Sequence, residues 1–434
     1  MKYASQHFAI LGAGRSGLGA ARLARLHGAK VTVFDEDEKA KPVEDFKYVL
    51  GQAARDLVVK PGDFDLVIIS PGLDEHWPLP TRFTAAGVPL VGETEFGFHL
   101  TDMPMVAITG TNGKSTCTEL VAALFNGCGM KSIPCGNHGT SLSEVVASGE
   151  RYDVLAVEIS SFQLETIRKF RAKASLWLNF APDHLDRYPG MAEYFAAKSR
   201  IFENCTESDV AIVRAGESVS SGKAKRWTFS AYGAEADCRY ANGRFYHASQ
   251  EIGSAANLSI RGKHNMENVL AALMAGKVYG LEFGAMLRAL AGYQVPRHRC
   301  ELIRTLEDRE YINDSKATNL HALEACLRSQ ERPIVLIAGG KDKQLDYTPL
   351  RAELKGQVRA MVFIGEIAPQ LEKTFGDLLP CRRGKGMAEA VSLAKQLSQP
   401  GDAIILSPGT SSFDMFNGYG QRGDAFREAV LSLS

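Results

Sequence analysis

The segment MVAITGTNGKST, residues 105–116, combines an apolar run, a glycine-bearing turn, a lysine and two hydroxyl residues. A strand that turns through glycines into a helix leaves unpaired N–H groups at the helix N-terminus, where the helix dipole also favours an anion. Lys114 adds a charge for the outer phosphates of a nucleotide, and the hydroxyl of Ser115 or Thr116 can complete the shell of a magnesium ion. The turn is shorter than the usual G-x-x-x-x-G-K-[ST], and a glycine-rich corner with a solvated lysine is the alternative interpretation. We predict a phosphate loop made of Gly110, Thr111, Asn112, Gly113, Lys114, Ser115 and Thr116.

A second glycine-rich turn, GAGRSG, lies near the N-terminus with glycines at 12, 14 and 17. It joins an apolar strand to a helix with small and apolar residues, and Asp35 ends the following strand. This pattern is typical of dinucleotide-binding folds, and it would suit an oxidoreductase that uses a nicotinamide cofactor. The same turn can bind any diphosphate, including that of a nucleotide sugar. The strand at residues 64–73 ends in Ser70-Pro71-Gly72, on the side where parallel sheets bind ligands.

Acidic and basic residues follow the later strands of the central region. Glu158 ends the strand VLAVEIS, in the sheet that carries the phosphate loop, and is placed to hold magnesium directly or through water. Asp183, His184 and Asp186 cluster in NFAPDHLDRY, where the imidazole could ligate or orient. On spacing alone, Lys198 is only a lysine on the solvated face of an amphipathic helix.

The last third of the chain carries a different set of polar turns. His298 and Arg299 precede NDSKATN, in which Asp314 and Lys316 follow a strand. Further along are GGKDK, with lysines at 341 and 343, and SPGTSSFDMF, with serines at 411 and 412. Hydroxyls, turn N–H groups and lysines after parallel strands make a receptor for a carboxylate.

The charge balance, the length of the apolar runs and the cysteine spacing exclude several classes of protein. The 434 residues carry 50 basic and 50 acidic side chains, so no net charge indicates a nucleic-acid partner. The apolar runs are of strand length, and they predict a protein that neither crosses nor binds a membrane. None of the eight cysteines forms a C-x-x-C pair, which favours reduced thiols used in packing, a cytoplasmic location, and no zinc site.

The alternation of strands and helices predicts an α/β fold with three domains. A Rossmann-like domain spans residues 1–92, a central P-loop-type domain 93–296, and a Rossmann-like domain 297–434. The central sheet should be mostly parallel, with an antiparallel patch over residues 209–260 that contains an Asn242-Gly243 hairpin turn. Pro296 marks the joint, and a hairpin over residues 300–315 opens the last domain.

Taken together, ITGTNGKST, AVEISSFQLE, NFAPDHLDRY, AAKSRIF, HNMEN, His298-Arg299 and NDSKATN resemble the Mur ligases across nearly the whole chain. These are ATP-dependent amide-forming enzymes of peptidoglycan precursor synthesis. DHLDRY, INDSKATN and the N-terminal GAGRSG are most similar to the branch of the family that adds D-glutamate to UDP-N-acetylmuramoyl-L-alanine. In the alanine-, diamino-acid- and folate-type relatives, the counterpart of INDSKATN characteristically contains a D-Y-x-H or D-x-A-H pattern. This sequence lacks that pattern.

The resemblance implies roles for individual residues. Lys114 and Ser115 would hold the ATP phosphates and one Mg²⁺ ion shared with Glu158, while His184 and a carbamylated Lys198 would serve a second. ATP would also contact Asn265, Asn268, Arg299 and Asp314. The uridine diphosphate would contact Gly14, Arg15, Ser16, Asp35 and Gly72, with Asn137 on the sugar-carrying substrate. The incoming glutamate would contact Lys316, Thr318, Lys343, Ser412, Phe413 and Tyr419, although Lys341 and Ser411 remain alternatives.

The resemblance implies a two-step ligation through an acyl phosphate, carried out by a monomer whose third domain closes on ATP. Two other functions stay open on the residues alone. One is the nicotinamide-dependent oxidoreductase, which leaves the phosphate loop and NDSKATN unused. The other is a phosphate-loop ATPase that ligates nothing. Within the family, another Mur-type ligase or one that adds L-glutamate is the alternative, because the sequence does not decide between D- and L-glutamate.

Overall fold

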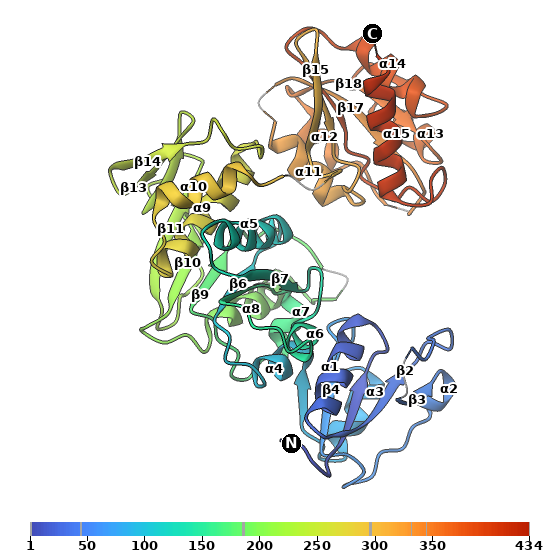
Figure 1. The fold of residues 1–434 in the computed structure, drawn as a ribbon. Helices are drawn as coiled ribbons and strands as arrows, with labels where there is room; N and C mark the ends of the chain where they lie inside the picture. Colours follow the sequence, from blue (N-terminus) through green and yellow to red (C-terminus); the bar gives the residue numbers. More distant parts are fainter. Residues whose placement is uncertain are drawn as a thin grey trace. The chain divides into compact units, whose positions relative to one another are not determined.

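The computed structural model describes residues 2–43, 46–184, 187–294, 297–330, 332–343 and 345–433. Pro296 and Asp186, which the sequence analysis singled out, lie outside these ranges. The chain forms two compact units, one made of residues 1–258 and 264–293 and the other of 259–263 and 294–434. The first unit contains two β-sheets and the second contains one (Figure 1).

The N-terminal sheet has the strand order β3-β2-β1-β4-β5, and all its pairings are parallel. As predicted, a strand, a helix and a strand open the chain. Apolar residues on both faces of the sheet are buried, and Phe96, which follows the predicted boundary at residue 92, packs into the same core as Phe8. The elements are β1 His7–Leu11, α1 Arg15–Leu26, β2 Lys30–Asp35, β3 Lys47–Leu50, α2 Gln52–Arg55, β4 Leu66–Ile69, α3 Pro78–Ala85, β5 Leu90–Gly92 and α4 Glu93–Phe98.

The central sheet has nine strands in the order β14-β13-β12-β11-β10-β9-β6-β8-β7. Buried β-branched and aliphatic residues fill β6 and β8, as expected for strands covered on both faces. The elements are β6 Met105–Thr109, α5 Lys114–Gly127, β7 Ser132–Gly136, α6 Leu142–Ala147, β8 Val154–Glu158, α7 Ser161–Glu165, β9 Ala174–Trp177, α8 Met191–Ser199, η1 Arg200–Phe202, β10 Val210–Arg214, β11 Lys225–Ser230, β12 Cys238–Ala241, β13 Arg244–His247, β14 Gln250–Ser254, α9 Lys263–Val278 and α10 Phe283–Ala291.

The antiparallel patch is smaller than predicted. β10, β11 and β12 continue the parallel sheet, and only β12, β13 and β14 pair antiparallel. The hairpin turn at Asn242-Gly243 is confirmed, with φ of 49° and 78°. Strand length and turn residues correctly indicated a series of short strands. Whether these strands run parallel or antiparallel depends on how they pair across the sheet, which the local sequence does not specify.

The second unit contains one mixed sheet, in the order β15-β16-β20-β17-β18-β19. The predicted hairpin of β15 and β16 is confirmed, and the other neighbours pair parallel. Separate apolar clusters lie on its two faces. The elements are β15 Glu301–Leu306, β16 Arg309–Asn313, α11 Leu320–Arg328, β17 Ile334–Gly339, α12 Leu350–Leu354, β18 Val358–Ile364, α13 Ala368–Phe375, β19 Cys381–Arg383, α14 Met387–Leu397, β20 Ala403–Leu406 and α15 Tyr419–Leu431.

Within the described ranges, no helix is both long enough and apolar enough to cross a membrane.

Candidate active site

The loop between β6 and α5 has the backbone of an anion-binding turn. Gly110 and Gly113 have φ of 156° and 81°, and a Cβ on Gly113 would lie 2.7 Å from Oδ1 of Asn268. Both positions therefore favour glycine. The turn ends where α5 begins at Lys114, so the first N–H groups of a 14-residue helix face the loop. Ser115 and Thr116 lie in the first turn of this helix.

Asn179, just after β9, holds the phosphate loop in shape. Its backbone carbonyl accepts from Thr111 N–H at 3.0 Å, and its Oδ1 accepts from Asn112 N–H at 2.8 Å. Its amide nitrogen donates to the Asn112 carbonyl at 3.0 Å. Sequence reasoning quoted this asparagine within NFAPDHLDRY but assigned it no role, because its partners lie 67 residues away.

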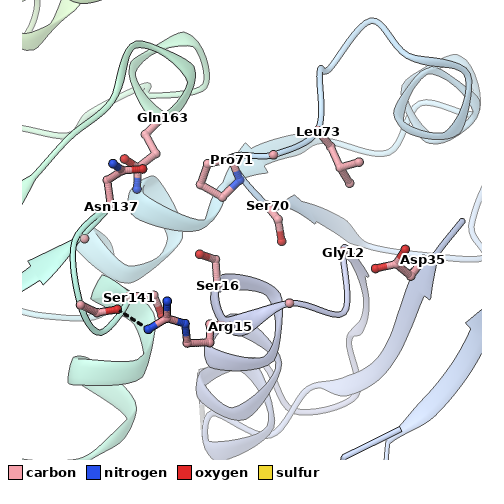
Figure 2. A pocket seen from close by; sticks show the side chains of 14 residues that line it. Gly12, Arg15, Ser16, Asp35, Ser70, Pro71, Leu73, Asn137, Ser141 and Gln163 are labelled. Atoms are coloured by element: carbon pink, nitrogen blue, oxygen red, sulfur yellow. Dashed lines mark hydrogen bonds between the residues drawn. The ribbon is translucent and has the colours of Figure 1, made fainter. Parts of the chain in front are cut away.

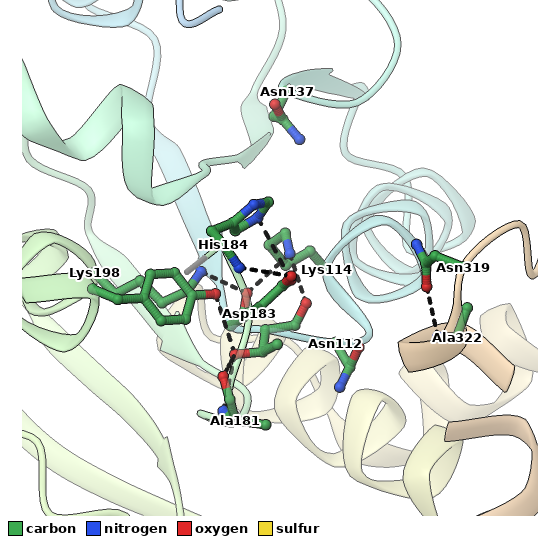
Figure 3. A network of polar contacts seen from close by, with 12 residues as sticks. Asn112, Lys114, Asn137, Ala181, Asp183, His184, Lys198, Asn319 and Ala322 are labelled. Carbon is green, nitrogen blue, oxygen red and sulfur yellow. Dashed lines mark hydrogen bonds and ion pairs between the residues drawn. The ribbon is translucent and has the colours of Figure 1, made fainter. Parts of the chain in front are cut away.

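Two lysines converge on one carbonyl of the phosphate loop (Figure 3). The Lys114 ammonium donates to the Gly110 oxygen at 2.9 Å and to the Thr111 oxygen at 2.8 Å. The Lys198 ammonium donates to the same Gly110 oxygen at 2.8 Å. Lys198 is only 1% exposed, and burial together with the charge of Lys114 lowers its pKa to about 6. Burial also lowers the pKa of Lys114.

Glu158 presents a buried, unsatisfied oxygen beside the phosphate loop. It ends β8 and lies in register with Ile108 of β6, next to the start of the loop. Its Oε1 accepts a hydrogen bond of 2.7 Å from the Asn137 amide, whereas its Oε2 has no partner among the described residues. A carboxylate oxygen left free in this way suits a hard cation such as Mg²⁺.

His184 and Lys198 face the same aromatic ring. The His184 ring lies 5.8 Å from that of Tyr194, and the Lys198 ammonium lies 5.0 Å from the Tyr194 centroid. His184 has a left-handed φ of 55°, and its Nε2 is 3.5 Å from Oδ2 of Asp183. Asp183, which the sequence analysis placed in the cluster without a role, also accepts a hydrogen bond of 2.9 Å from the His184 N–H through its Oδ1, so it lies directly beside the imidazole.

Two asparagines on α9 border the loop from another side. The Asn268 amide donates to Oδ1 of Asn265 at 3.3 Å, and both residues are buried. Oδ1 of Asn268 lies directly next to Gly113, so the two asparagines lie beside the start of α5. The structure therefore brings these predicted ATP contacts to the phosphate loop.

A cavity of about 390 Å³ lies at the carboxyl ends of the N-terminal strands (Figure 2). We call it the carrier cavity. It contains all six residues that the resemblance assigned to the nucleotide-sugar substrate, and its lining comprises Gly12, Gly14, Arg15, Ser16, Asp35, Ser70, Pro71, Gly72, Leu73, Gly136, Asn137, Gly139, Ser141 and Gln163. Loops of the central sheet thus form part of its wall.

Of the polar groups in the carrier cavity, sequence reasoning missed Gln163 and named Ser70 only as part of a turn. The buried Ser70 hydroxyl has no partner among the described residues, and Gln163 enters from α7. The Asp35 carboxylate accepts from the N–H groups of Ala13 at 2.7 Å and Asp37 at 2.9 Å, so it also shapes the glycine turn. The Arg15 guanidinium donates to the Gly139 carbonyl at 3.1 Å, 124 residues away in the sequence.

In the second unit, Asp314 follows β16 and is buried. Its Oδ2 accepts from the Ser407 hydroxyl at 2.9 Å and its Oδ1 from Cys300 N–H at 3.2 Å. Burial raises the pKa of Asp314 to about 6. Lys316, two residues later, places its ammonium 5.7 Å from the Tyr419 ring centroid.

Lys343 and Thr318 lie together, because the Lys343 ammonium donates to the Thr318 carbonyl at 3.1 Å. This contact separates Lys343 from Lys341, whose backbone pairs with Ser411 instead. The Ser412 hydroxyl is buried without a partner in the described structure, and Phe413 is 67% exposed. Arg299 is half-buried and precedes Cys300.

Arg422 joins three of these turns, although sequence reasoning gave it no role. Its guanidinium is fully buried and donates to Ser315 Oγ at 3.1 Å, to the Ser315 carbonyl at 2.9 Å and to the Thr410 carbonyl at 3.0 Å. A longer contact of 3.5 Å reaches the Gly339 carbonyl. Burial lowers the pKa of Arg422 to about 10.

Known families match both the central region and the last third. Residues 108–276 match the Mur ligase middle domain, and residues 298–409 match the Mur ligase glutamate ligase domain. The chain belongs to the Mur ligase family. Relatives from Geobacter metallireducens and Trichlorobacter lovleyi, 37% and 38% identical, are both named UDP-N-acetylmuramoylalanine–D-glutamate ligase. Each alignment covers 100% of this chain and 99% or 100% of the relative.

Solved structures show the same fold at low sequence identity. A UDP-N-acetylmuramate–alanine ligase from Thermotoga maritima is 18% identical, with a TM-score of 0.58, over 98% of this chain and 99% of its own. A MurF ligase from the same organism, solved in complex with ADP, is 13% identical with a TM-score of 0.59 and covers 99% of this chain and 95% of its own.

Proposed function

We propose that this chain is an ATP-dependent ligase that joins D-glutamate to UDP-N-acetylmuramoyl-L-alanine through an acyl phosphate. We call UDP-N-acetylmuramoyl-L-alanine the carrier. Its terminal carboxylate attacks the γ-phosphorus of ATP, and the bond to the β-phosphate oxygen breaks to release ADP. The amine of glutamate then attacks the acyl carbonyl, phosphate leaves, and the amine loses a proton. The protein acts as a cytoplasmic monomer on small-molecule substrates, without nucleic acid or membrane.

One observation carries the proposal: a hydrogen bond of 2.7 Å joins the two anion-binding regions of the first unit. Asn137 lines the carrier cavity, and its amide donates to Glu158, which borders the phosphate loop. A nucleotide sugar in the cavity and a triphosphate on the loop would therefore meet near this pair. Most of the catalytic advantage of such a site comes from positioning, up to about 7–11 kcal/mol.

Lys114 has the charge and position to contact the transferring phosphate. Its ammonium donates to two carbonyls of its own loop, and it can exchange these two hydrogen bonds for bonds to phosphate oxygens. We assign Ser115 and Glu158 to one Mg²⁺ ion, and the free Oε2 of Glu158 supports this. Bound magnesium would neutralise charge on the phosphate oxygens.

Lys198 is suited to carbamylation. Only a neutral amine attacks carbon dioxide, and the lowered pKa of about 6 leaves Lys198 mostly neutral at pH 7. The product is an anionic oxygen ligand, which with His184 would hold a second Mg²⁺. The common contact of both side chains with Tyr194 supports this pairing.

The other end of the reaction is assigned to the turns of the second unit. Lys316, Thr318, Lys343, Ser412, Phe413 and Tyr419 receive glutamate, with Lys343 preferred to Lys341 because its ammonium lies at Thr318. The orphaned Ser412 hydroxyl is a candidate donor to a carboxylate. We assign Asn265, Asn268, Arg299 and Asp314 to ATP.

The test measures phosphate release from ATP with purified full-length protein. Release should require both UDP-N-acetylmuramoyl-L-alanine and D-glutamate, and mass spectrometry should find one glutamate added to the carrier. Parallel reactions with L-glutamate and L-alanine should give no product. If phosphate were released equally well without UDP-N-acetylmuramoyl-L-alanine or without D-glutamate, the protein would be an ATPase only and the proposal would be refuted.

A further inference from the structure

Two cysteines and a carboxylate meet at one point of the second unit. Cys300 precedes β15, Asp314 follows β16 and Cys326 lies on α11. The antiparallel pairing of Glu301 with Asn313 places Cys300 and Asp314 at the same end of the hairpin. The two Sγ atoms are 3.7 Å apart, and both lie within 4.8 Å of a carboxylate oxygen of Asp314. We call these three residues the dithiol cluster.

From this geometry we propose that the dithiol cluster is a binding site for a thiophilic divalent metal, Zn²⁺ above all. Tetrahedral zinc with Zn–S distances of about 2.3 Å places its two sulfurs about 3.8 Å apart. The separation of 3.7 Å between Cys300 and Cys326 matches this edge without movement. Zinc binding would release the two thiol protons to solvent, and the resulting two thiolates and one carboxylate form a three-ligand set with a fourth position for water.

The surroundings of Asp314 support it as a ligand. The Ser407 hydroxyl donates to one carboxylate oxygen and the Cys300 N–H to the other, so the carboxylate is fixed in orientation. Supporting hydrogen bonds of this kind are what hold metal ligands in place. The two thiols of the cluster also hydrogen-bond to this carboxylate, so a metal ion that displaces their protons would take the place of those protons beside the carboxylate oxygens.

The composition of the cluster also favours a metal over a simple thiol pair. Cys326 is 2% exposed and Cys300 is half-buried, so the cluster is largely shielded from bulk solvent. A disulfide would require the sulfurs to close from 3.7 Å to about 2.05 Å, and it would give the carboxylate no part. The sequence predicted no zinc site because residues 300 and 326 are not spaced as a local motif, but the fold brings them together.

The site has a consequence that rests on the proposed function. Asp314 is the residue that we assign to ATP, and a metal that recruits its carboxylate withdraws it from the nucleotide. Zinc bound here should therefore inhibit ligation competitively with ATP, and the inhibition should depend on the cysteines.

The direct test uses Co²⁺ as a spectroscopic probe on reduced, full-length protein. We expect one Co²⁺ per chain, a thiolate-to-cobalt charge-transfer band, and its loss when Zn²⁺ is added. The Cys300→Ser and Cys326→Ala variants should each weaken Co²⁺ binding by more than about 100-fold, because even residues that only support a ligand change metal affinity about 10- to 100-fold. Ser407→Ala, which removes only a support, should fall within that smaller range and keep the band.

Cys381→Ser is the matched control, since Cys381 is a half-buried cysteine of the same unit outside the cluster. It should bind Co²⁺ like the parent chain. Absence of the band, its equal loss in Cys381→Ser, or a Cys300–Cys326 disulfide as the only product under reducing conditions would overturn the metal site. If Co²⁺ binds as expected but Zn²⁺ does not inhibit ligation, the site stands and the assignment of Asp314 to ATP is wrong.

Discussion

Replacing Arg422 by methionine should destabilise the second unit and impair glutamate binding. The guanidinium makes three hydrogen bonds of 2.9–3.1 Å to the Ser315 and Thr410 turns. Bonds that involve a charged group contribute about 1.5–3 kcal/mol each, or about 5–9 kcal/mol together. The lowered pKa of about 10 corresponds to a desolvation cost of roughly 3 kcal/mol. The expected net loss of stability is therefore about 2–6 kcal/mol.

The assay must report on the second unit alone. The three tryptophans, at positions 77, 177 and 227, all lie in the first unit, so tryptophan fluorescence would miss the effect. Amide hydrogen exchange of β17 and β20 reports directly on the sheet beneath these turns. We expect the exchange protection of these strands to fall in Arg422→Met by an amount that matches the lost stability.

Steady-state kinetics distinguish positioning from simple stability. The KM for D-glutamate should rise at least tenfold while the KM for the carrier stays unchanged, because the carrier cavity lies in the other unit. Arg422→Lys keeps the positive charge but loses the planar guanidinium fork. Compared with Arg422→Met, it should therefore recover more of the amide exchange protection than of the affinity for glutamate.

The control is Arg427→Met on the same helix. Arg427 is 37% exposed in its side chain and pairs with Glu301, which predicts a change of at most about 1 kcal/mol. If Arg422→Met matched Arg427→Met in both exchange protection and KM, Arg422 would not organise the turns.

Three further predictions concern the reaction. Lys198→Ala should lose activity and regain part of it with an added short carboxylate, and the bicarbonate dependence of the unmodified chain should steepen as the pH falls below about 6, where the amine becomes protonated; no rescue together with activity that ignores bicarbonate would contradict the carbamate. Asn137→Ala should lower kcat/KM for the carrier about 10- to 100-fold, or about 1.4–2.7 kcal/mol, because it removes a cavity contact and the hydrogen bond to Glu158. An unchanged kcat/KM would show that this hydrogen bond does not couple the carrier cavity to the phosphate loop. Lys343→Ala should raise the KM for glutamate far more than Lys341→Ala, and the reverse order would assign the role to Lys341.

Local signals in the sequence predicted the parts of the site that depend on adjacent residues. The phosphate loop and the N-terminal glycine turn were predicted because glycines, strand and helix follow one another within about a dozen residues. The strand ends at Glu158 and Asp314 followed from the rule that ligands bind at the carboxyl edge of parallel sheets.

Contacts between distant residues were not predictable in this way. The pairing of Asn179 with Asn112 spans 67 residues, and that of Arg422 with Ser315 spans 107. Helical spacing placed Lys198 on a solvated face, yet it is buried against the phosphate loop, and only the family resemblance indicated its importance. Amphipathic patterns describe a helix alone, and they fail where a second layer covers its polar side.

The proximity of Lys114 and Lys198, which share one carbonyl, predicts an order of assembly for the proposed carbamate. Burial and, after it, the charge of Lys114 lower the pKa of Lys198, and phosphate oxygens of ATP would neutralise the charge of Lys114. Once ATP is seated, Lys198 would hold its proton more strongly and react less readily with carbon dioxide. Capture of carbon dioxide should therefore precede ATP loading, so a ligase first mixed with nucleotide and then given bicarbonate should start its turnover with a lag.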